Sequence, residues 1–390
     1  MIKKMRASQE KRTDKQRELA AYGEIDILSR GGRGRSLGSQ RGGSGEPKSD
    51  LAMGNEDFDR AAGQKPALIS LETAHPLMED GWRAADLHLH TFYSYDVVPT
   101  REVDPLVLYE KARARGMSFV CFTDHDTMKA YDRVGWTREG VVTGVEVKVL
   151  DRKRVGHTVH INVYLLSRQQ FEEIEKIARV AGDIEMLVEY LKAENLPFTF
   201  NHPFWHEPVE KLNAGAVVEL ADVFPVLEYN LGRIAKLNRM VLELAAAKSK
   251  GVVAGTDSQT GDVGRIFTVA RGENFREFFE AIKSGDSRLV TEDLTYHRIK
   301  NEIRNRLEML MDNRRWVMGK EGLRMETGNA LADAVIETLS GGREDVLAVK
   351  REVTKFLARI VSSTGVPARL YLRKQNMLAS RIQQELNLAL

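Results

Sequence analysis

The chain has 390 residues, a formal net charge of +2, 42% hydrophobic and 29% charged residues, which together predict a soluble globular protein. No run approaches the roughly 20 apolar residues of a membrane helix, so we expect no membrane partner. The single cysteine, Cys121, excludes an intramolecular disulfide framework and is typical of a reducing compartment, so we expect a cytoplasmic protein.

The charge is unevenly distributed along the chain. Basic residues exceed acidic ones by 12 to 7 in residues 1–50 and by 17 to 11 in residues 295–390, so the middle of the chain is acidic. An acidic middle suits a cation site. The basic flanks suit a polyanion, although ordinary solvated faces are the better explanation.

The first 80 residues are expected to form a disordered, low-complexity extension. Residues 30–50 are rich in Gly, Ser and Arg and have too few apolar side chains to offset the entropy of ordering.

From Arg83 to about residue 292, short apolar runs alternate with helical periods. This alternation predicts an α/β fold, either a parallel barrel or a wound sheet. The expected strands are Ala85–His90, Ser118–Thr123, Val141–Val149, Thr158–Leu166, Phe198–Asn201, Val226–Asn230, Val252–Thr256 and Arg265–Val269. The expected helices are Asp104–Arg115, Arg168–Glu194, Ile234–Ser249 and Asn274–Ser284.

Residues 295–390 have a different pattern, with long helical stretches. We expect helices over Tyr296–Met318, Leu331–Leu339, Glu344–Ser362 and Leu370–Leu390. These predict a helical C-terminal appendage, and its apolar residues favour packing or homo-oligomerisation.

Histidines and carboxylates recur at the ends of the expected strands. Two histidines spaced i, i+2 on a strand share a face and can reach one ion together. The residues concerned are His88, His90, Asp96, His125, Glu146, His160, His202 and Asp257. Imidazole and carboxylate together suit zinc, manganese or iron, and eight ligands are enough for two or three ions.

In their order, these motifs resemble the PHP family, named for polymerase and histidinol phosphatase, over residues 84–290. The resemblance implies a metal-dependent phosphoesterase on a distorted (β/α)7 barrel. It implies that His88 and His90 bind one ion together with Glu146 and Asp257. It further implies that a second ion shares Glu146 and takes His160 and His202, and that a third takes Asp96, His125 and position 259.

Position 259 departs from the family pattern, which places a histidine there. This chain has Asp257-Ser258-Gln259. A glutamine amide oxygen is a weaker ligand than imidazole, so we expect the third site to be weak, empty or differently occupied.

Two residues near the motifs are candidates for a direct role in the reaction. Asp124 could orient His125 or a water, and Arg265 could neutralise phosphate oxygens, although a surface ion pair explains Arg265 almost as well. Other residues leave alternatives open. His157 could replace His160 as a ligand, Glu228-Tyr229-Asn230 could support the ligands, and Tyr93 and Tyr95 could stack on a base or simply pack.

These observations predict a phosphoesterase that uses two or three divalent ions (Zn, Mn or Fe) to activate a water. The expected substrate is a nucleotide, a nucleic-acid end or a small phosphomonoester. One alternative is a small-molecule phosphatase of the histidinol-phosphatase type. Another is a catalytically weakened scaffold that binds partners.

Overall fold

The computed structural model describes residues 66–311, 330–340 and 348–389. All the described residues belong to one compact unit, Phe58–Leu390. Among them, no helix is both long and apolar enough to cross a membrane. Most of the predicted N-terminal extension, residues 1–65, lies outside the described part of the chain.

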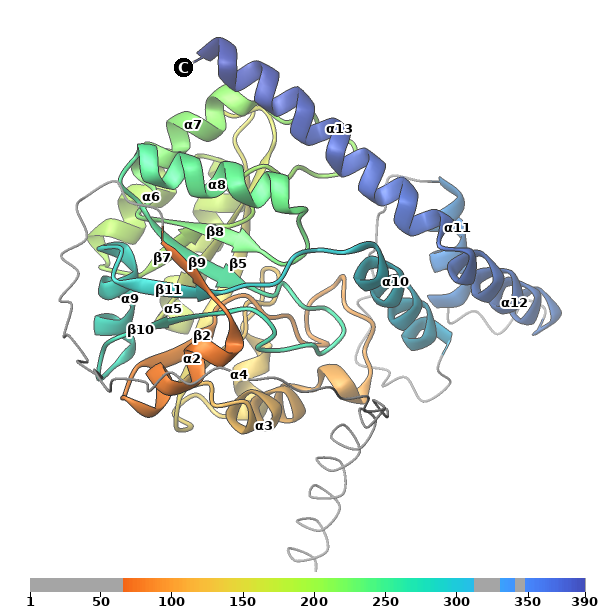
Figure 1. The fold of residues 1–390 in the computed structure, drawn as a ribbon, viewed down its shortest axis with the longest axis horizontal. Helices are drawn as coiled ribbons and strands as arrows, with labels where there is room; N and C mark the ends of the chain where they lie inside the picture. Colours follow the sequence, from red (N-terminus) through yellow and green to blue (C-terminus); the bar gives the residue numbers. More distant parts are fainter. Residues whose placement is uncertain (1–65, 312–329, 341–347, 390) are drawn as a thin grey trace, which may run out of the picture. The chain divides into compact units, whose positions relative to one another are not determined.

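The strands form two sheets (Figure 1). The first has the order β1 (Ala67–Ile69), β11 (Ser287–Val290), β10 (Phe267–Ala270), β2 (Arg83–Asp86), β3 (Phe119–Cys121) and β4 (Val141–Val142). The second has the order β5 (Gly144–Leu150), β6 (Thr158–Tyr164), β7 (Phe198–Phe200), β8 (Val226–Asn230) and β9 (Gly251–Gly255).

Helices alternate with these strands along the chain. Up to residue 290 they are α2 (Leu71–Glu79), η1 (Arg101–Val103), α3 (Pro105–Ala114), α4 (Lys129–Val134), α5 (Arg168–Glu175), the π-helix η2 (Lys176–Ala181), α6 (Ile184–Ala193), α7 (Ala214–Val223), α8 (Ala235–Ala247) and α9 (Phe275–Lys283). This confirms a mixed α/β fold. Strands β6, β8 and β9 are buried along their whole length. Strand β9 is a continuous apolar run, as a strand buried on both faces requires, whereas β6 and β8 also bury polar side chains such as His160 and Glu228.

The predicted parallel arrangement is found for only some of the strand pairs. Strands β5 and β6 pair antiparallel from Gly144 opposite Tyr164 to Leu150 opposite Thr158, and β6 and β7 are also antiparallel. The reason is the connection: only residues 151–157 join β5 to β6, too few for the helical crossover that parallel neighbours need. Because β6 runs backwards, its first residues lie at the same edge as the last residues of the parallel strands β7, β8 and β9.

The two sheets are joined where the functional motifs begin. One bridge pairs Leu89, beyond β2, with Ser258, beyond β9, and a second pairs His125, beyond β3, with Glu146 on β5. Backbone hydrogen bonds reinforce both, including Asp257 N to His88 O at 2.8 Å and Asp126 N to Glu146 O at 3.0 Å. The expected strand Val141–Val149 is therefore two strands, β4 and β5, which belong to different sheets.

Residues 67–79, which the sequence places in the disordered extension, instead form β1 and α2. Strand β1 pairs in parallel with β11, with Ala67 opposite Arg288. Helix α2 begins after Ser70, whose side chain accepts a hydrogen bond from Thr73 N, and it buries Ala74. The extension therefore ends earlier than expected.

The expected helix Arg168–Glu194 is interrupted in the structure. Gly182 adopts a left-handed backbone (φ 58°), and Asp183 then caps α6 by accepting a hydrogen bond from Met186 N. A left-handed glycine followed by a capping aspartate ends one helix and begins the next. The π-helix η2 ends at Ala181, directly before this break.

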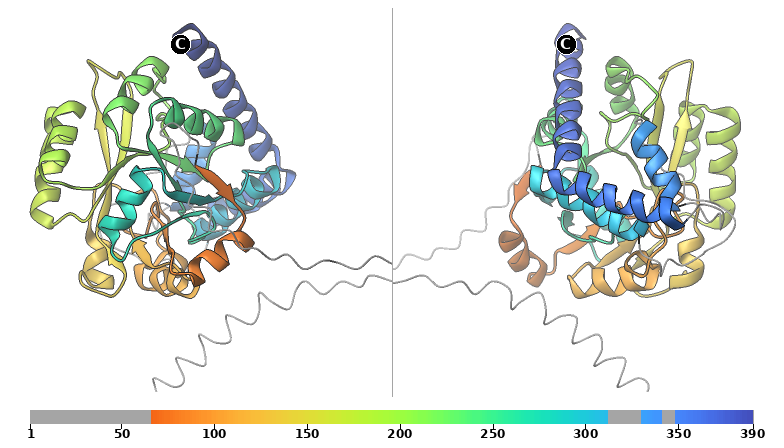
Figure 2. Two further views of the ribbon diagram at one scale, coloured as in Figure 1. Left: turned by 60° about the vertical axis from the view of Figure 1, so that its left-hand side comes forward. Right: turned by 90° about the vertical axis from the view of Figure 1, so that its right-hand side faces the viewer.

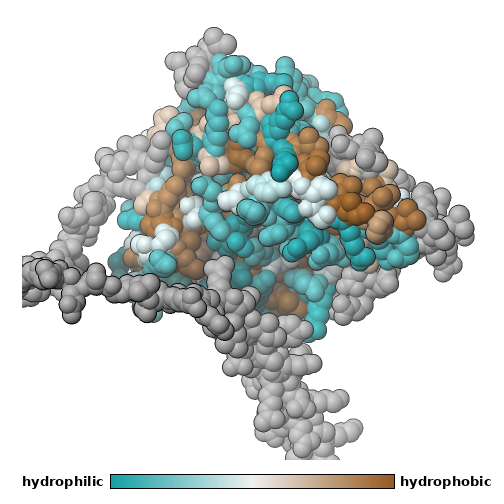
Figure 3. Space-filling model, turned by 45° about the vertical axis from the view of Figure 1, so that its right-hand side comes forward, coloured by the Kyte–Doolittle hydropathy of each residue, from teal (hydrophilic) through white to brown (hydrophobic). Residues whose placement is uncertain are grey.

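The C-terminal region forms α10 (Tyr296–Met311), α11 (Ala330–Ser340), α12 (Ala348–Thr364) and α13 (Val366–Ala389), as expected apart from the helix ends. These helices contact one another, and α13 also contacts α7 and α8 (Figures 1 and 2). Hydrophobic surface is visible on this side of the molecule (Figure 3). On α12 it comes from Val353, Phe356, Leu357, Ile360 and Val361, each at least 44% exposed.

Candidate metal centre

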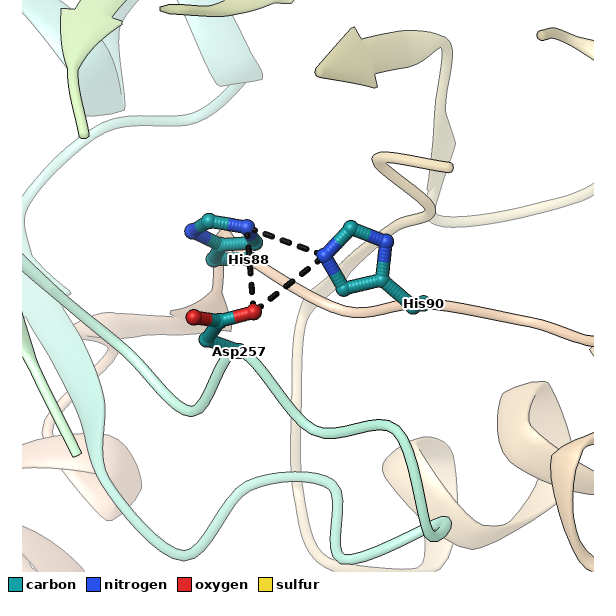
Figure 4. Close-up of side chains that lie close together, drawn as sticks. All are labelled: His88, His90 and Asp257. Atoms are coloured by element: carbon teal, nitrogen blue, oxygen red, sulfur yellow. Dashed lines mark hydrogen bonds and ion pairs between the residues drawn. The ribbon is translucent and has the colours of Figure 1, made fainter. Parts of the chain in front are cut away.

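Three side chains from two chain segments converge on one point (Figure 4). His88 and His90 follow β2, and Asp257 follows β9. The Nε2 atoms of the two histidines are 3.1 Å apart, and the Asp257 Oδ1 atom lies 3.5 Å from the first and 3.2 Å from the second. Both histidines are buried. The leucines that alternate with them, Leu87 and Leu89, are fully buried as well, so the alternation of an extended chain places both imidazoles on one side.

Glu146 lies at the centre of a wider cluster and uses both of its carboxylate oxygens. Its Oε2 atom lies 3.2 Å from His88 Nε2 and 3.3 Å from His90 Nε2. Its Oε1 atom lies 3.0 Å from His160 Nδ1 and 3.3 Å from His202 Nε2. Glu146 therefore stands between two pairs of histidines, in the position of a bridging carboxylate.

His125 completes the cluster from the end of β3. Its Nδ1 atom is 3.0 Å from Glu146 Oε2. Three sets of ligand atoms in the described residues are compact enough to hold a metal ion. They are His88 with His90 and Asp257, His88 with Glu146 and His202, and His90 with His125 and Glu146.

Supporting hydrogen bonds orient the rings toward the centre. His88 Nδ1 pairs with Glu228 Oε1 at 2.6 Å, which leaves its Nε2 atom facing the cluster. His90 Nδ1 lies 3.3 Å from Ser94 Oγ and is oriented in the same way. Such outer partners fix the tautomer of metal-ligating histidines. This geometry favours the supporting role that the sequence suggests for Glu228.

The buried carboxylates of the cluster require positive charge close to them. Burial alone would lower the pKa of His88, but the carboxylates of Glu228, Glu146 and Asp257 outweigh it and raise that pKa well above its usual value. Burial would raise the pKa of Glu146, but the surrounding histidines hold it well below its usual range. Such a buried group of carboxylates is stable only with protons on the imidazoles or with bound cations.

The donor set fits divalent metal ions. Within the described residues, three buried atoms of the cluster make no hydrogen bond of their own: His125 Nδ1, Glu146 Oε2 and His160 Nε2. Buried polar atoms rarely lack a partner, and ring nitrogens and carboxylate oxygens facing one point are ligands for zinc, manganese or iron. The fold and the cluster thus define an α/β protein with a buried site suited to divalent cations.

The position implied for a third ion has a different arrangement. Gln259 Nε2 donates a hydrogen bond to Asp96 Oδ2 at 2.5 Å, and His125 Nε2 lies 3.6 Å from the same oxygen. An amide nitrogen has no lone pair for a metal, so Gln259 here holds the carboxylate directly. Asp96 belongs to none of the three compact ligand sets.

The two residues expected to act in the reaction, Asp124 and Arg265, both make hydrogen bonds to other side chains of the protein. Asp124 accepts hydrogen bonds from Thr91 N at 2.5 Å and Thr91 Oγ1 at 2.7 Å, and its burial raises its pKa to about 6. It therefore holds the segment after His90. Arg265 hydrogen bonds to both carboxylate oxygens of Glu292, at 2.6 and 3.1 Å, and it also pairs with Asp262. This geometry favours the ion-pair alternative.

The two candidate histidines, His160 on β6 and His157 just before it, lie in different surroundings. His160 contacts Glu146, whereas His157 Nδ1 accepts a hydrogen bond from Asn213 N at 3.4 Å. His160 lies in the cluster because β6 is antiparallel to its neighbours. Its first residues therefore lie at the edge where β7 ends.

Several residues around the cluster were not expected from the sequence. Arg233 Nη2 lies 4.0 Å from Asp257 Oδ2, and Trp205 packs its edge against His160 and His202. Lys148 pairs with Glu207, whose Oε1 atom is 3.6 Å from His160 Nε2. Lys148 had a signal in the sequence, because residues two apart on a strand share a face and Glu146 is its neighbour at that spacing.

Helix α10 also reaches the site. Glu302 accepts a hydrogen bond from Thr260 Oγ1 at 3.0 Å, beside Gln259, and pairs with Arg306. Burial would lower the pKa of Arg306, but Glu302 and, more weakly, Asp96 and Asp257 raise that pKa above its usual value. A C-terminal helix thus places a cation near the cluster.

Comparisons with known proteins give low similarity. No protein-family model matches the chain, and no curated protein is significantly similar to it in sequence. PfuEndoQ, a lesion-specific endonuclease from Pyrococcus furiosus, is 19% identical, with 53% of this chain and 57% of that chain covered and a TM-score of 0.39. This chain therefore spans slightly more than half of PfuEndoQ.

Two other solved structures cover most of their own length. PsfC from Pseudomonas syringae is 15% identical, with 58% of this chain and 99% of that chain covered and a TM-score of 0.43. A protein from Bifidobacterium adolescentis assigned as a metal-dependent phosphoesterase is 16% identical, with 57% and 95% covered and a TM-score of 0.33. At these values no activity is assigned from the likeness. The chain resembles the PHP family in the order of its cluster residues along the sequence.

Proposed function

We propose that the chain is a metal-dependent phosphoesterase of the PHP type, built on a distorted (β/α)7 barrel. The observation that carries the proposal is Glu146, whose two oxygens face two separate groups of histidines. The bridges that join β2 to β9 and β3 to β5 support the barrel, because they link the strands that carry the ligands into one ring.

The proposed ligands form two sets that share Glu146. The first set adds His88, His90 and Asp257, and the second adds His160 and His202. Divalent ions bound there would polarise a phosphate ester and lower the pKa of a coordinated water.

The remaining residues position the ligands and the substrate. Glu228 holds His88 in the tautomer that faces the centre, and its other oxygen accepts a hydrogen bond from His202 N at 2.8 Å. Arg233, only 12% exposed, lies against both Asp257 and Trp205. Its guanidinium is the cation that we place next to the substrate, where it would donate two hydrogen bonds to phosphate oxygens. The proposed substrate is a phosphate ester: a nucleotide, a nucleic-acid end or a small phosphomonoester.

The alternative of a weakened scaffold rests on the hydrogen bond from Gln259 to Asp96, which closes the third position. The other two sets retain all their ligand groups. Two ions suffice to hold the attacking and leaving oxygens of a phosphate ester, so we favour the enzyme.

Hydrolysis of p-nitrophenyl phosphate tests the proposal. We expect activity with manganese or zinc and none with excess chelator. Replacing Glu146 by Gln keeps the shape but removes the charge, so kcat should fall by about 100-fold or more. The matched control is Glu210→Gln, because Glu210 binds Thr158 outside the cluster, and it should retain activity. Equal rates in wild type and Glu146→Gln would refute the assignment.

A further inference from the structure

His160 is a histidine whose two ring nitrogens face different carboxylates. Its Nδ1 atom lies 3.0 Å from Glu146 Oε1, inside the cluster. Its Nε2 atom is buried and makes no hydrogen bond with any described residue, and Glu207 Oε1 lies 3.6 Å from it. A neutral imidazole binds a metal ion through one nitrogen and carries its proton on the other. The surroundings of the Nε2 atom therefore decide which nitrogen is free to bind an ion.

Glu207 is held beside His160 by a lysine of the neighbouring strand. Lys148 on β5 lies directly opposite His160 on β6 in the antiparallel register. Its Nζ atom donates a hydrogen bond to Glu207 Oε1 at 2.5 Å, so the two side chains form an ion pair. The ammonium group also lies 5.0 Å from the centre of the Tyr95 ring, which stacks on His125. Lys148 thus lies between a carboxylate and an aromatic face, and its position determines that of Glu207.

Two roles are chemically open to a carboxylate in this position. Glu207 could bind an ion itself, or it could accept a hydrogen bond from His160 Nε2–H. Lys148 argues against the first role, because its ammonium group contacts the same oxygen that faces His160, and a metal ion there would meet a like charge at close range. Glu207 also belongs to none of the three compact ligand sets found in the described residues. The second role needs only a small adjustment, since shortening the 3.6 Å separation by about 0.6 Å gives the usual N–H···O distance.

The local chemistry suits the second role. A carboxylate paired with an ammonium group is ionised, and an ionised carboxylate only accepts hydrogen bonds. Trp205, which packs its edge against the His160 ring, can only donate one. Histidines that bind metal ions usually donate their second ring N–H to a carboxylate, which fixes the orientation of the ring. Glu228 stands in that relation to His88, although there it contacts Nδ1 and leaves Nε2 facing the cluster.

We propose that Glu207, held by Lys148, accepts a hydrogen bond from His160 Nε2–H and so leaves the Nδ1 atom to bind the second ion together with Glu146. The inference rests on the proposed function, whose second ligand set contains His160. Glu207 is a positioning residue, because it acts through the ring that it orients and contacts neither the ion nor the substrate. The two ligand sets then use opposite ring nitrogens, Nε2 in the first set and Nδ1 of His160 in the second.

Manganese binding to Glu207→Leu tests this role. By equilibrium dialysis of the chelator-stripped protein, we expect one of the two ions to bind about 10- to 100-fold more weakly than in the wild type, as the loss of such an outer partner predicts. Glu207→Gln, whose amide oxygen still accepts a hydrogen bond, should weaken binding less. The matched control is Glu185→Leu, which removes a carboxylate from the exposed ion pair with Arg154 and should bind manganese as the wild type does.

Nitrogen-15 NMR of the histidine-labelled, zinc-loaded wild type supplies a readout that a merely structural role would not change. We expect His160 to carry its proton on Nε2 and to bind zinc through Nδ1, its resonances being assigned by their absence from His160→Gln. In Glu207→Leu the Nε2 proton should exchange faster with water. The wild-type spectrum decides the matter even where Glu207→Leu fails to fold.

Three results would overturn the inference: a proton on His160 Nδ1, an unchanged manganese affinity in folded Glu207→Leu, or a wild type that binds no metal. Normal metal binding by the wild type without hydrolysis of any phosphate ester would instead overturn the proposed function alone.

Discussion

Glu146 shows how a single residue gains its role from its surroundings. From the sequence alone, a single glutamate near the start of a strand is most simply explained as a surface charge. In the structure it is fully buried, and five histidines approach its two oxygens. A buried carboxylate at such a position requires cations around it, so its presence is itself an indication of metal binding.

Gln259 is the residue where this chain differs from the pattern that it resembles. Because its amide nitrogen holds Asp96, we predict that Gln259→His increases the metal content by about one ion per chain. Metal content is measured by mass spectrometry after identical loading and desalting. Gln259→Ala is the control, since it removes the hydrogen bond without supplying a ligand, and it should not raise the content. Three ions already present in the wild type would show that glutamine, or a residue nearby, completes the site.

Glu292 tests the structural role of Arg265. The hydrogen bond from Arg265 outweighs burial and, with Arg298, lowers the pKa of Glu292 from 4.5 to about 2. A carboxylate with a lowered folded-state pKa stabilises the protein above its unfolded pKa, and the stabilisation is lost as the pH falls toward the folded value. We therefore predict that Glu292→Gln lowers the unfolding free energy at neutral pH by about 0.2–1 kcal/mol, the range for exposed pairs.

The same pair defines the pH dependence of this effect. The difference between wild type and Glu292→Gln should shrink as the pH falls from about 4.5 toward 2. Urea unfolding at several pH values measures it. A difference that grows on acidification would contradict the ion pair. A large rise of KM in Arg265→Gln would support the catalytic role that the sequence suggests.

At the scale of secondary structure, local patterns predict most of the elements. Strand β8 has the expected bounds, and the expected helix before β3 differs from α3 by a residue at each end. Periodicity fails where pairing is remote or an element is short. Strand β1 has three residues, and its partner β11 lies more than 200 residues away, so no local signal identifies either strand. Helix α4 has only six residues.

The direction of β5 and β6 shows why the site could be only partly predicted. Strand ends can be located from apolar runs, but which end meets the ligand cluster depends on pairing. The connection of residues 151–157 is visible in the sequence and is too short for a parallel pair, although a parallel arrangement was expected. The split between β4 and β5 at Thr143 has no comparable signal in the sequence. The ligand motifs could be assigned because each lies next to an apolar run. Arg233 and Arg306 could not, because only tertiary packing brings them to the cluster.

The N-terminal strand and helix lead to a prediction about stability. Strand β1 pairs with β11, and α2 packs against β10. A chain that begins at Trp82 should therefore melt at least about 4 °C below a chain that begins at Pro66, because edge pairing and the burial of Ala74 are lost. Thermal unfolding of the two chains measures the difference. Identical transitions would show that β1 and α2 contribute nothing to the stability of the unit.

At the scale of the whole molecule, the C-terminal helices are joined to the site and not only to one another. The sequence separates residues 83–292 from residues 295–390, and both belong to one compact unit, Phe58–Leu390. Through Glu302, helix α10 supports the loop that carries Asp257 and Gln259. Homo-oligomerisation through these helices and a cytoplasmic location stay predictions.

The central claim is that the buried cluster holds at least two divalent ions. The most direct measurement is equilibrium dialysis of the chelator-stripped protein against manganese, with metal per chain counted by mass spectrometry. We predict about two tightly bound ions in the wild type, and loss of at least one of them in Glu146→Gln, because that carboxylate is shared. Glu210→Gln should bind as the wild type does. A wild type that binds no manganese or zinc, or a Glu146→Gln variant with full metal content, would contradict the account.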